Sequence, residues 1–506
     1  MPFGENDAAH QFGKADAMTW MDKAPREMPH FLAMWYRHNP NDFYAPIYPA
    51  PVAINIAMMQ ILAQQRFQPV NLYYAVTCCF MTIAAVYLLL RKTFGFLTAF
   101  LSGFFLVFML RNIYFYLWGQ RPALIALSFV PLTIYCFYKY MASYVSNKEK
   151  PAYIYIVGVF FGIMAYLHPT SVVAAVFPIM LLTILFWIKN KRIPFSIKSS
   201  FIAVILFVVI FSPFLPDILG QSSVRRITPI TISSFLHWYV FPNQNPPNPF
   251  LYSFREMNGG YWTVPFIIIG IAVLVLRKSD KDLVMLSWLV GLYLALHIGT
   301  IFVHSRSNRI LTSSAHVLWP IAVIGLLSIP SLLGLRNPVK KYLKYFLIGL
   351  FLILVINFNA KPAMNLLKES YKPYLRVTPP QLKVAEWIDQ NLPEYALLYI
   401  AGPMTYPKQQ WIHVLSHRAM QTEAIFKNLK TAQEASKDIP VQNRIGYVVV
   451  DYSDAALMLS SPDPRAQQRG MALHQHLQRF EESLNTTLNA TLIYNRDKVK
   501  VYKLGE

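Results

Sequence analysis

The chain has 506 residues, of which 55% are hydrophobic and 14% are charged, and its mean hydropathy is +0.34. A soluble protein of this length carries about 25% charged residues, so a soluble globular protein is excluded. The formal net charge is +21, which in a soluble protein would suggest a nucleic-acid partner. In a membrane protein Lys and Arg collect in the cytoplasmic loops, and this explanation argues against nucleic-acid binding.

An acidic segment lies at the start of the chain, where residues 4–10 read GENDAAH. A helix that begins near Asp7 places Asp7 and His10 on one face. Glu5 and Asp7 are close enough to share a cation, or one of them could deprotonate an acceptor hydroxyl near a membrane surface. The alternative is that Asp7 is an N-cap and Glu5 a solvated side chain.

A stretch rich in tyrosine and proline follows at residues 44–51, which read YAPIYPAP. Residues 49–64 are apolar, begin with proline and end in glutamines. A membrane crossing here would disturb the charge pattern of the later loops. We therefore predict a helix that lies in or dips into the membrane interface.

Ten apolar runs then follow, each near the length that crosses a hydrocarbon layer about 30 Å thick. They cover residues 70–90, 93–110, 122–141, 152–168, 170–188, 198–217, 261–276, 282–303, 313–333 and 342–358. Clusters of Lys and Arg follow the first, third, fifth, seventh and ninth runs, and the cluster at 336–344 is an example. By the positive-inside rule these loops are cytoplasmic, although Arg225 and Arg226 depart from the pattern.

This alternation places residues 1–69 and everything after residue 358 on the extracytoplasmic side. The acidic segment would then lie outside with no helix before it. We expect either that the run at 70–90 translocates the N-terminus or that an upstream helix is missing from this sequence.

Polar residues at the outer ends of the runs are candidates for binding a lipid phosphate. Arg121 begins a run, Arg309 lies just before another, and an arginine can bind a phosphate in bidentate fashion. The alternative for both is an interfacial side chain that reaches the lipid headgroups. His168 separates two apolar runs and is either a functional ionisable group or an ordinary histidine at a helix end.

The outer loop 218–260 is rich in aromatic residues and proline. Such residues form an interfacial belt, or platforms for sugars in a loop that closes over a substrate. Glu256 is the carboxylate in the later part of this loop and could pair with an arginine.

Residues 359–506 are more charged and have the pattern of a soluble domain. We predict helices at 382–391 and 472–485, strands at 396–401 and 446–451, and a closing hairpin at 491–504. The predicted fold is a polytopic α-helical membrane protein with about ten spans and a C-terminal soluble α/β domain. The domains would be an outer N-terminal loop (1–69), a transmembrane domain (70–358) and an extracytoplasmic α/β domain (359–506).

This order of segments resembles the GT-C class of polyprenyl-phosphate-dependent glycosyltransferases. The class includes oligosaccharyltransferase catalytic subunits, protein O-mannosyltransferases and lipid A aminoarabinose transferases. Residues 5–10 (ENDAAH) are similar to the acidic motif that these enzymes carry just after their first helix. The sequence departs from the class in one respect, because the helix expected before the motif is absent.

The resemblance implies an inverting transfer of sugar from a polyprenyl-phosphate donor to a glycan, lipid or protein acceptor on the extracytoplasmic side. Asp7 would be the catalytic base, with Glu5 and His10 beside it. Asp7 and Glu5 would also be the ligands of a divalent cation, Mg²⁺ or Mn²⁺. The residues expected to bind substrate at the outer face are Arg121, His168, Glu256 and Arg309.

Two other classes remain open at this stage. A transporter or lipid flippase is less consistent with the sequence, because few ionisable residues lie in the middle of the runs and the two halves show no symmetry. A non-catalytic membrane scaffold whose C-terminal part binds partners is the third hypothesis.

Overall fold

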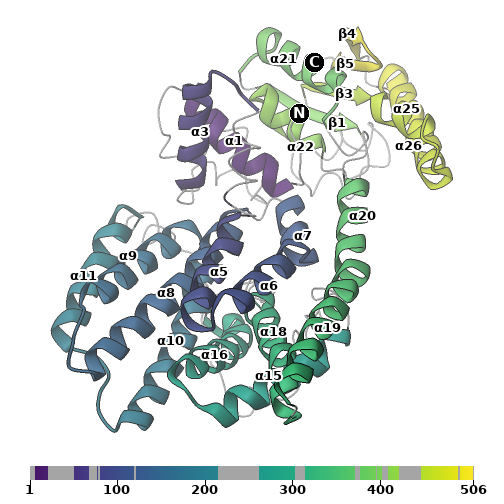
Figure 1. Cartoon of the computed structure of the whole chain (residues 1–506). Coiled ribbons are helices and arrows are strands. Elements are labelled where there is room, and N and C mark those ends of the chain that lie inside the picture. Colours follow the sequence, from purple (N-terminus) through teal and green to yellow (C-terminus); the bar gives the residue numbers. More distant parts are fainter. Residues whose placement is uncertain are drawn as a thin grey trace. The chain divides into compact units, whose positions relative to one another are not determined.

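The structure is a computed structural model of the whole chain (Figure 1). It describes residues 6–20, 51–67, 77, 80–118, 121–214, 261–302, 314–334, 336–370, 377–394, 396–401, 408–420, 446–487 and 490–504. The chain divides into two compact units. The terminal unit contains residues 1–72, 117–119 and 368–506, and the helical unit contains residues 73–116 and 120–367. The predicted domain boundaries at 69 and 358 stay predictions.

The helical unit is built from helices that follow the apolar runs of the sequence (Figure 1). They are α5 (Met81–Thr93), α6 (Phe96–Val107), α7 (Leu110–Trp118), α8 (Arg121–Val145), α9 (Ala152–Leu167), α10 (Pro169–Asn190), α11 (Ile197–Phe211), α15 (Val264–Arg277), α16 (Asp280–Phe302), α18 (Ser314–Leu332) and α19 (Asn337–Val355). After α19 come a π-helical turn, η7 (Ile356–Ala360), and α20 (Lys361–Ser370). Every predicted run contains a helix, and the sequence analysis missed α7.

Four helices among the described residues are long and apolar enough to cross a membrane. They are Arg121–Val145, Thr170–Asn190, Ser314–Leu332 and the continuous stretch Asn337–Lys368. The protein is therefore a helical membrane protein, and the count of ten spans stays a prediction.

Glycines allow several of these helices to approach each other at backbone distance. Gly158 and Gly162 lie one turn apart on α9 and face α11, where a Cβ atom on Gly158 would come within 2.2 Å of the carbonyl oxygen of Ala203. Gly270 of α15 meets α18 in the same way, with 2.1 Å to the carbonyl oxygen of Ile321. Small residues at such crossings are how helices pack in lipid, where the hydrophobic effect does not press them together.

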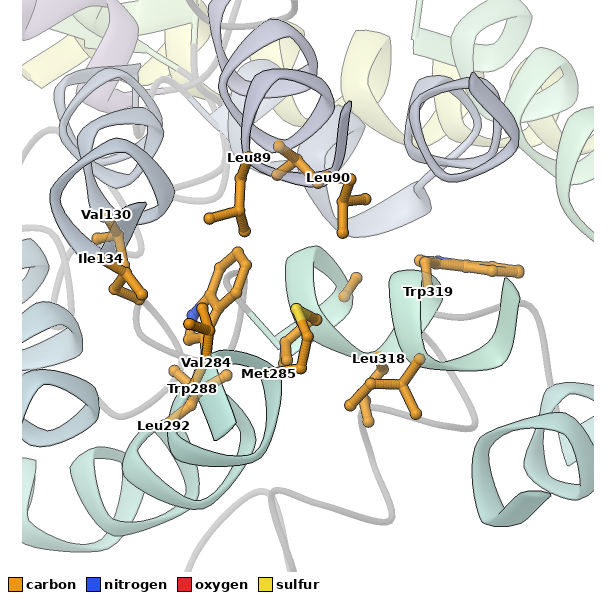
Figure 2. Packing of buried hydrophobic residues seen from close by; sticks show 14 of the residues in the cluster. Leu89, Leu90, Val130, Ile134, Val284, Met285, Trp288, Leu292, Leu318 and Trp319 are labelled. Atoms are coloured by element: carbon orange, nitrogen blue, oxygen red, sulfur yellow. The ribbon is translucent and has the colours of Figure 1, made fainter. Parts of the chain in front are cut away.

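An apolar core joins most of the described helices of this unit (Figure 2). Trp288 of α16 and Trp319 of α18 are its largest side chains, and both are almost wholly buried. Leu89 and Leu90 of α5 lie on the other side of the same core. Helices that are far apart in the sequence are thus held together by one cluster of contacts.

The C-terminal part of the terminal unit contains a five-stranded mixed sheet in the order β2-β1-β3-β5-β4. Its strands are β1 (Leu397–Ala401), β2 (Ala419–Met420), β3 (Tyr447–Asp451), β4 (Thr491–Arg496) and β5 (Val499–Lys503). β1 pairs in parallel with β2 and β3, and β5 pairs antiparallel with β3 and β4. The helices of this part are α21 (Pro379–Asn391), α22 (Lys408–Ser416), α25 (Ser453–Leu459) and α26 (Pro464–Thr487).

Local sequence explains these elements well. α21 begins with a capping box, in which Thr378 accepts from the backbone N–H of Gln381 and the Gln381 side chain accepts from the backbone N–H of Thr378. Asp497 and Lys498 both have positive φ and form the two-residue loop of the β4–β5 hairpin, the backbone shape of a type I′ turn. Val448 and Val450 of β3 are buried in one cluster with Leu477 and Phe480 of α26. The predicted strands and hairpin agree with the structure, whereas β2, α22 and α25 were not predicted.

Two N-terminal helices belong to the same terminal unit, α1 (Asn6–Trp20) and α3 (Pro51–Ala63). α3 buries Ala53, Ile56 and Ala57, while the side chains of its other face are exposed. These exposed side chains are Ile54, Met58, Ile61 and Leu62. An exposed apolar face suits the predicted place in the membrane interface, which stays a prediction.

Candidate functional site

The acidic segment of the sequence begins helix α1. Asp7 and His10 both belong to this helix, as the spacing predicted. Glu5 precedes it and lies outside the described residues, and the side chains of Asp7 and His10 are not described either. By helical spacing, residues 7, 10 and 14 share one face of α1, and residues 12 and 16 share another.

The face of α1 that carries residues 12 and 16 packs against α3 and α22. The ring of Phe12 stacks on Phe67 at 5.4 Å between centroids and lies 5.5 Å from the ring of Trp411. Ala15 and Ala17 are fully buried. Small and aromatic residues thus let α1 pack closely against residues from the C-terminal part of the chain.

A buried charged cluster fixes this packing, and it centres on Asp16. The carboxylate of Asp16 accepts two hydrogen bonds from the guanidinium of Arg66, one of them 2.8 Å long from Nε. Its other partner is Nε2 of His417, which lies 3.0 Å from Oδ2. Burial by itself would raise the pKa of Asp16, but the hydrogen bonds and charges of His417 and Arg66 more than offset it and lower the pKa.

His417 continues the cluster toward α21. Its Nδ1 lies 3.2 Å from both carboxylate oxygens of Asp389, and its ring stacks on Trp20 at 4.7 Å. Arg418 also contacts Asp389, with Nη1 at 3.2 Å from Oδ1. A neutral imidazole has one N–H, so the ring donates to both carboxylates only when it is protonated.

We call Asp16, Arg66, Asp389, His417 and Arg418 the Asp16 clamp. It joins α1 to residues about 400 positions later in the chain, and it holds the helix that carries Asp7 in one place. The sequence analysis singled out none of its members. The only signal was a lone acidic residue in the second half of α1, and that signal names no partner.

Lys14 is a second buried charge on α1. It is 4% exposed, and burial lowers its pKa to about 8. It lies two residues from Asp16, and hence on the opposite side of the helix, but seven residues from Asp7, and hence on the same side.

Arg121 and His168 lie in the helical unit. Arg121 is the first residue of α8 and is 2% exposed. Its Nε donates to the carbonyl oxygen of Tyr116 at 3.4 Å, and its guanidinium lies 5.0 Å from the centre of the Tyr116 ring. This burial does not agree with a side chain that reaches out to lipid headgroups. A cation at the positive end of a helix is a place that favours an anion.

His168 ends α9 and is the N-cap of α10. Its Nδ1 accepts from the backbone N–H of Thr170 at 3.4 Å and lies 2.6 Å from the Thr170 hydroxyl. The structure thus gives His168 the ordinary role at a helix end. A role in substrate binding stays a prediction.

The other predicted residues, Glu256 and Arg309, lie outside the described residues, and so does the aromatic loop 218–260. No three His, Cys, Asp or Glu side chains gather as metal ligands in the described ranges. Because the predicted ligands Glu5 and Asp7 fall outside the described side chains, the divalent cation stays a prediction.

The chain is similar to a family of membrane enzymes and to several of their solved structures. Residues 49–216 match the model of a family described as dolichyl-phosphate-mannose-protein mannosyltransferase. The oligosaccharyltransferase of Archaeoglobus fulgidus in its apo form is 12% identical, with a TM-score of 0.56 over 100% of this chain and 71% of that one. No curated protein matches the chain.

Two further structures share the fold. The same archaeal enzyme, AglB, in complex with an inhibitory peptide and a dolichol-phosphate is 12% identical, with a TM-score of 0.54 over 100% of this chain and 71% of that one. ArnT from Cupriavidus metallidurans bound to undecaprenyl phosphate is 11% identical, with a TM-score of 0.52 over 99% of this chain and 93% of that one. The likeness gives the fold, and the family match over residues 49–216 gives the enzyme class. The chain therefore has the fold of GT-C membrane glycosyltransferases, and residues 49–216 match a family of that class.

Proposed function

We propose that the chain transfers a glycosyl group from a polyprenyl-phosphate donor to an acceptor on the extracytoplasmic side of the membrane. The main support for this proposal is the match of residues 49–216 to the family described as dolichyl-phosphate-mannose-protein mannosyltransferase. Solved structures with the same fold contain dolichol phosphate and undecaprenyl phosphate, which supports a donor of this class.

In the proposed reaction Asp7 takes the proton of the acceptor hydroxyl. The acceptor oxygen attacks the anomeric carbon from the side opposite the phosphate, a new C–O bond forms, and the bond between carbon and phosphate oxygen breaks. The configuration at carbon inverts, and the polyprenyl phosphate leaves as an anion. Such a leaving group needs little help from an acid, so one base suffices.

The Asp16 clamp supports this role of α1. A catalytic base contributes most when its position is fixed before the substrate binds, because the cost of orienting it has then been met during folding. Asp16 lies nine residues after Asp7 on the same helix and is tied to Arg66 and His417. We infer that the clamp sets the position of the helix on which Asp7 and His10 lie.

The proposed anion-binding residues are Arg121 and Arg309, with His168 and Glu256 as further contacts to substrate. Arg121 has the burial and the position at a helix N-terminus that suit a phosphate. Stabilisation of the charge that develops on the leaving phosphate would be their main contribution.

Asp7 and Glu5 are suitable ligands for a divalent cation, because Mg²⁺ and Mn²⁺ prefer carboxylate oxygens. The archaeal oligosaccharyltransferase was also solved with Zn and sulfate. When bound, such a cation would neutralise phosphate charge. No step above depends on it, and chelation followed by restoration with Mg²⁺ or Mn²⁺ tests the requirement.

We further propose that the helical unit crosses the membrane ten times and that residues 359–506 form a soluble α/β domain outside the membrane. The sheet β2-β1-β3-β5-β4 with α21, α25 and α26 supports such a domain. Its proposed role is to bind the acceptor or to shape the site.

The decisive experiment measures transfer of radiolabelled sugar from polyprenyl-phosphate donors in membranes that contain the protein. We expect Asp7→Asn to lower the rate by roughly 10²- to 10⁴-fold, which is the range for a general base. The matched control is Asp280→Asn, which removes an exposed carboxylate paired with Lys189 and should leave the rate unchanged. Full activity of folded Asp7→Asn would remove Asp7 from the mechanism.

A further inference from the structure

The helical unit contains a cavity of about 470 Å³ that the proposed reaction does not use. It lies between α8, α9, α10 and α11, which are neighbours in Figure 1. α11 packs mainly against α9, where Gly158 lets the two backbones meet. The cavity is the space that remains between this pair of helices and the pair α8 and α10.

The lining of the cavity is apolar. Residues such as Phe137 of α8 and Val176 of α10 line it, and of the described residues in this lining only Ser200 is polar. Val204 of α11 also lines it and is 56% exposed, so the cavity is open on this side. An empty apolar cavity forfeits dispersion contacts, and its volume is typical of a site for a small organic molecule. In a membrane, the hydrocarbon that can fill it is the acyl chain of a lipid.

Basic residues gather at one end of the cavity. Phe195 and Ser200 line the cavity, and Arg192 and Lys198 precede them by three and two residues. The loop between α8 and α9 adds two lysines at the same end. The positive-inside rule predicts that this end is cytoplasmic. We call these residues the basic rim, and they are Lys148, Lys150, Lys191, Arg192 and Lys198.

Hydrogen bonds join the two loops that carry the basic rim. Nη1 of Arg192 donates to Oδ1 of Asn147 at 3.1 Å, and Nη2 donates to the carbonyl oxygen of Tyr144 at 2.5 Å. Glu149 is the one acidic residue in these two loops, and its carboxylate accepts from the hydroxyl of Ser199 at 2.6 Å. The rim therefore carries a net positive charge whose position is set by the fold.

A ligand that fills the cavity and also meets the basic rim must combine a hydrocarbon chain with a negative charge. An anionic phospholipid has both parts, and basic pockets between helices at the cytoplasmic side bind such headgroups. The polyprenyl-phosphate donor also has both parts, but its proposed phosphate ligand Arg121 begins α8. Phe137 lies sixteen residues further along this helix, or roughly 24 Å, so the cavity is far from that site.

We propose that the cavity binds an acyl chain of an anionic phospholipid from the cytoplasmic leaflet and that the basic rim binds its phosphate. The chain contacts α8 and α10 as well as α9 and α11, so it ties α11 to helices other than α9. This role is separate from the transfer of sugar.

Native mass spectrometry of the purified full-length protein in detergent tests the headgroup. The two lipids compared are dioleoylphosphatidylglycerol, which is anionic, and dioleoylphosphatidylcholine, which has no net charge. We expect the anionic lipid to bind about 10-fold more tightly, because each lysine near a headgroup contributes to the attraction. Lys150→Gln combined with Lys198→Gln should remove most of this preference. The control pair, Lys278→Gln with Lys341→Gln, removes two exposed lysines of other loops and should keep it.

Ser200→Phe tests the cavity, because its ring occupies the space of the acyl chain. We expect it to weaken the binding of both lipids by about 10-fold, the cost of forcing extra volume into a filled space. Val209→Phe is the matched control, since it puts the same ring on an exposed position of α11 outside the lining. If Ser200→Phe does not fold, Val204→Trp at the open side of the cavity replaces it in the same measurement.

The thermal midpoint gives a second readout. Phosphatidylglycerol should raise the midpoint of the unsubstituted protein and of Val209→Phe, but not that of Ser200→Phe. Without added lipid, Ser200→Phe should be at least as stable as the unsubstituted protein, because it fills an empty space.

Three results would overturn the proposal and leave the proposed function standing. They are equal affinity of the unsubstituted protein for the two lipids, a preference that survives the loss of Lys150 and Lys198, and unchanged binding in the folded cavity variant. A polyprenyl phosphate that binds more tightly than phosphatidylglycerol, and is lost in Ser200→Phe, would assign the cavity to the donor chain and overturn it as well.

Discussion

At the scale of single residues, Asp16 has the largest predicted effect on the terminal unit. Asp16→Asn removes the carboxylate charge that Arg66 and His417 both contact, and it leaves the guanidinium of Arg66 without its ion-pair partner. Breaking a buried ion pair of this kind costs about 3 kcal/mol of the free energy of unfolding. We expect a lower thermal midpoint and faster cleavage by protease between α1 and α3.

The control for this change is Asp280→Asn. Its carboxylate pairs with Lys189, both side chains are more than 40% exposed, and exposed pairs contribute at most about 1 kcal/mol. Equal stability of the two variants would show that the clamp does not hold α1.

His413 makes the terminal unit sensitive to acid. The ring is completely buried in α22, and burial lowers its pKa to about 3, from an ordinary value of 6.5. Between these pH values the unfolded chain binds a proton that the folded chain does not, so stability rises with pH and is lost as the pH falls below 6.5. From pH 7 to pH 5 this loss is about 2 kcal/mol.

We therefore expect the thermal midpoint of the protein to fall between pH 7 and pH 5, and to fall less in His413→Gln. His476 on α26 is exposed, and His476→Gln should keep the full dependence on pH. The pKa of Asp16 is lowered from 3.8, so its contribution is lost only as the pH falls below that value, outside the measured window. The same slope in His413→Gln as in the unsubstituted protein would contradict the assignment.

At the scale of elements, the contact between α9 and α11 depends on a glycine. Gly158→Ala places a methyl group 2.2 Å from the carbonyl oxygen of Ala203, which is backbone and cannot turn away. The two helices must move apart, at a cost of about 1–3 kcal/mol or more. Gly349→Ala in α19 is the control, because its Cβ meets nothing within 4 Å and alanine favours the helix by about 1 kcal/mol.

The thermal midpoint of the protein in detergent measures both changes. We expect it to fall for Gly158→Ala and to stay or rise for Gly349→Ala. A tolerated alanine at position 158 would mean that the helices do not approach as closely as the structure has them.

Elements that follow from local sequence were predictable, and contacts that join distant residues were not. Helix α21, strand β3 and the β4–β5 hairpin depend on neighbours in the chain, and the sequence analysis predicted all three elements. Strand β2 has only two residues, which are too few to show the alternation of a strand in the sequence. It is a strand only because it pairs with β1. The same holds for the candidate site, in which helix α1 was predicted but His417, which lies 401 residues from Asp16, was not.

At the scale of the whole molecule, the terminal unit contains both ends of the chain, and this restricts how the chain can cross the membrane. Residues 1–72 and 368–506 belong to one compact unit, and we therefore expect both to lie on the same side of the membrane. The chain between them must cross an even number of times. The ten predicted runs satisfy this condition.

The basic loops predict which side this is. Lys and Arg cluster after every second apolar run, as at residues 148–150, and the positive-inside rule makes those loops cytoplasmic.

Single cysteines test the arrangement in a protein whose Cys78, Cys79 and Cys136 are replaced by serine. An impermeant maleimide added to intact cells should label Gln65→Cys and Arg465→Cys, which are exposed positions before the first run and on α26. It should label Lys148→Cys only after the membrane is opened. Labels on opposite sides at positions 65 and 465 would separate the acidic helix from the C-terminal sheet, and labelling of position 148 alone would put the proposed site in the cytoplasm. The first result would contradict the terminal unit of the structure, and the second would exclude transfer on the outer face, since Asp7 would then lie away from the acceptor.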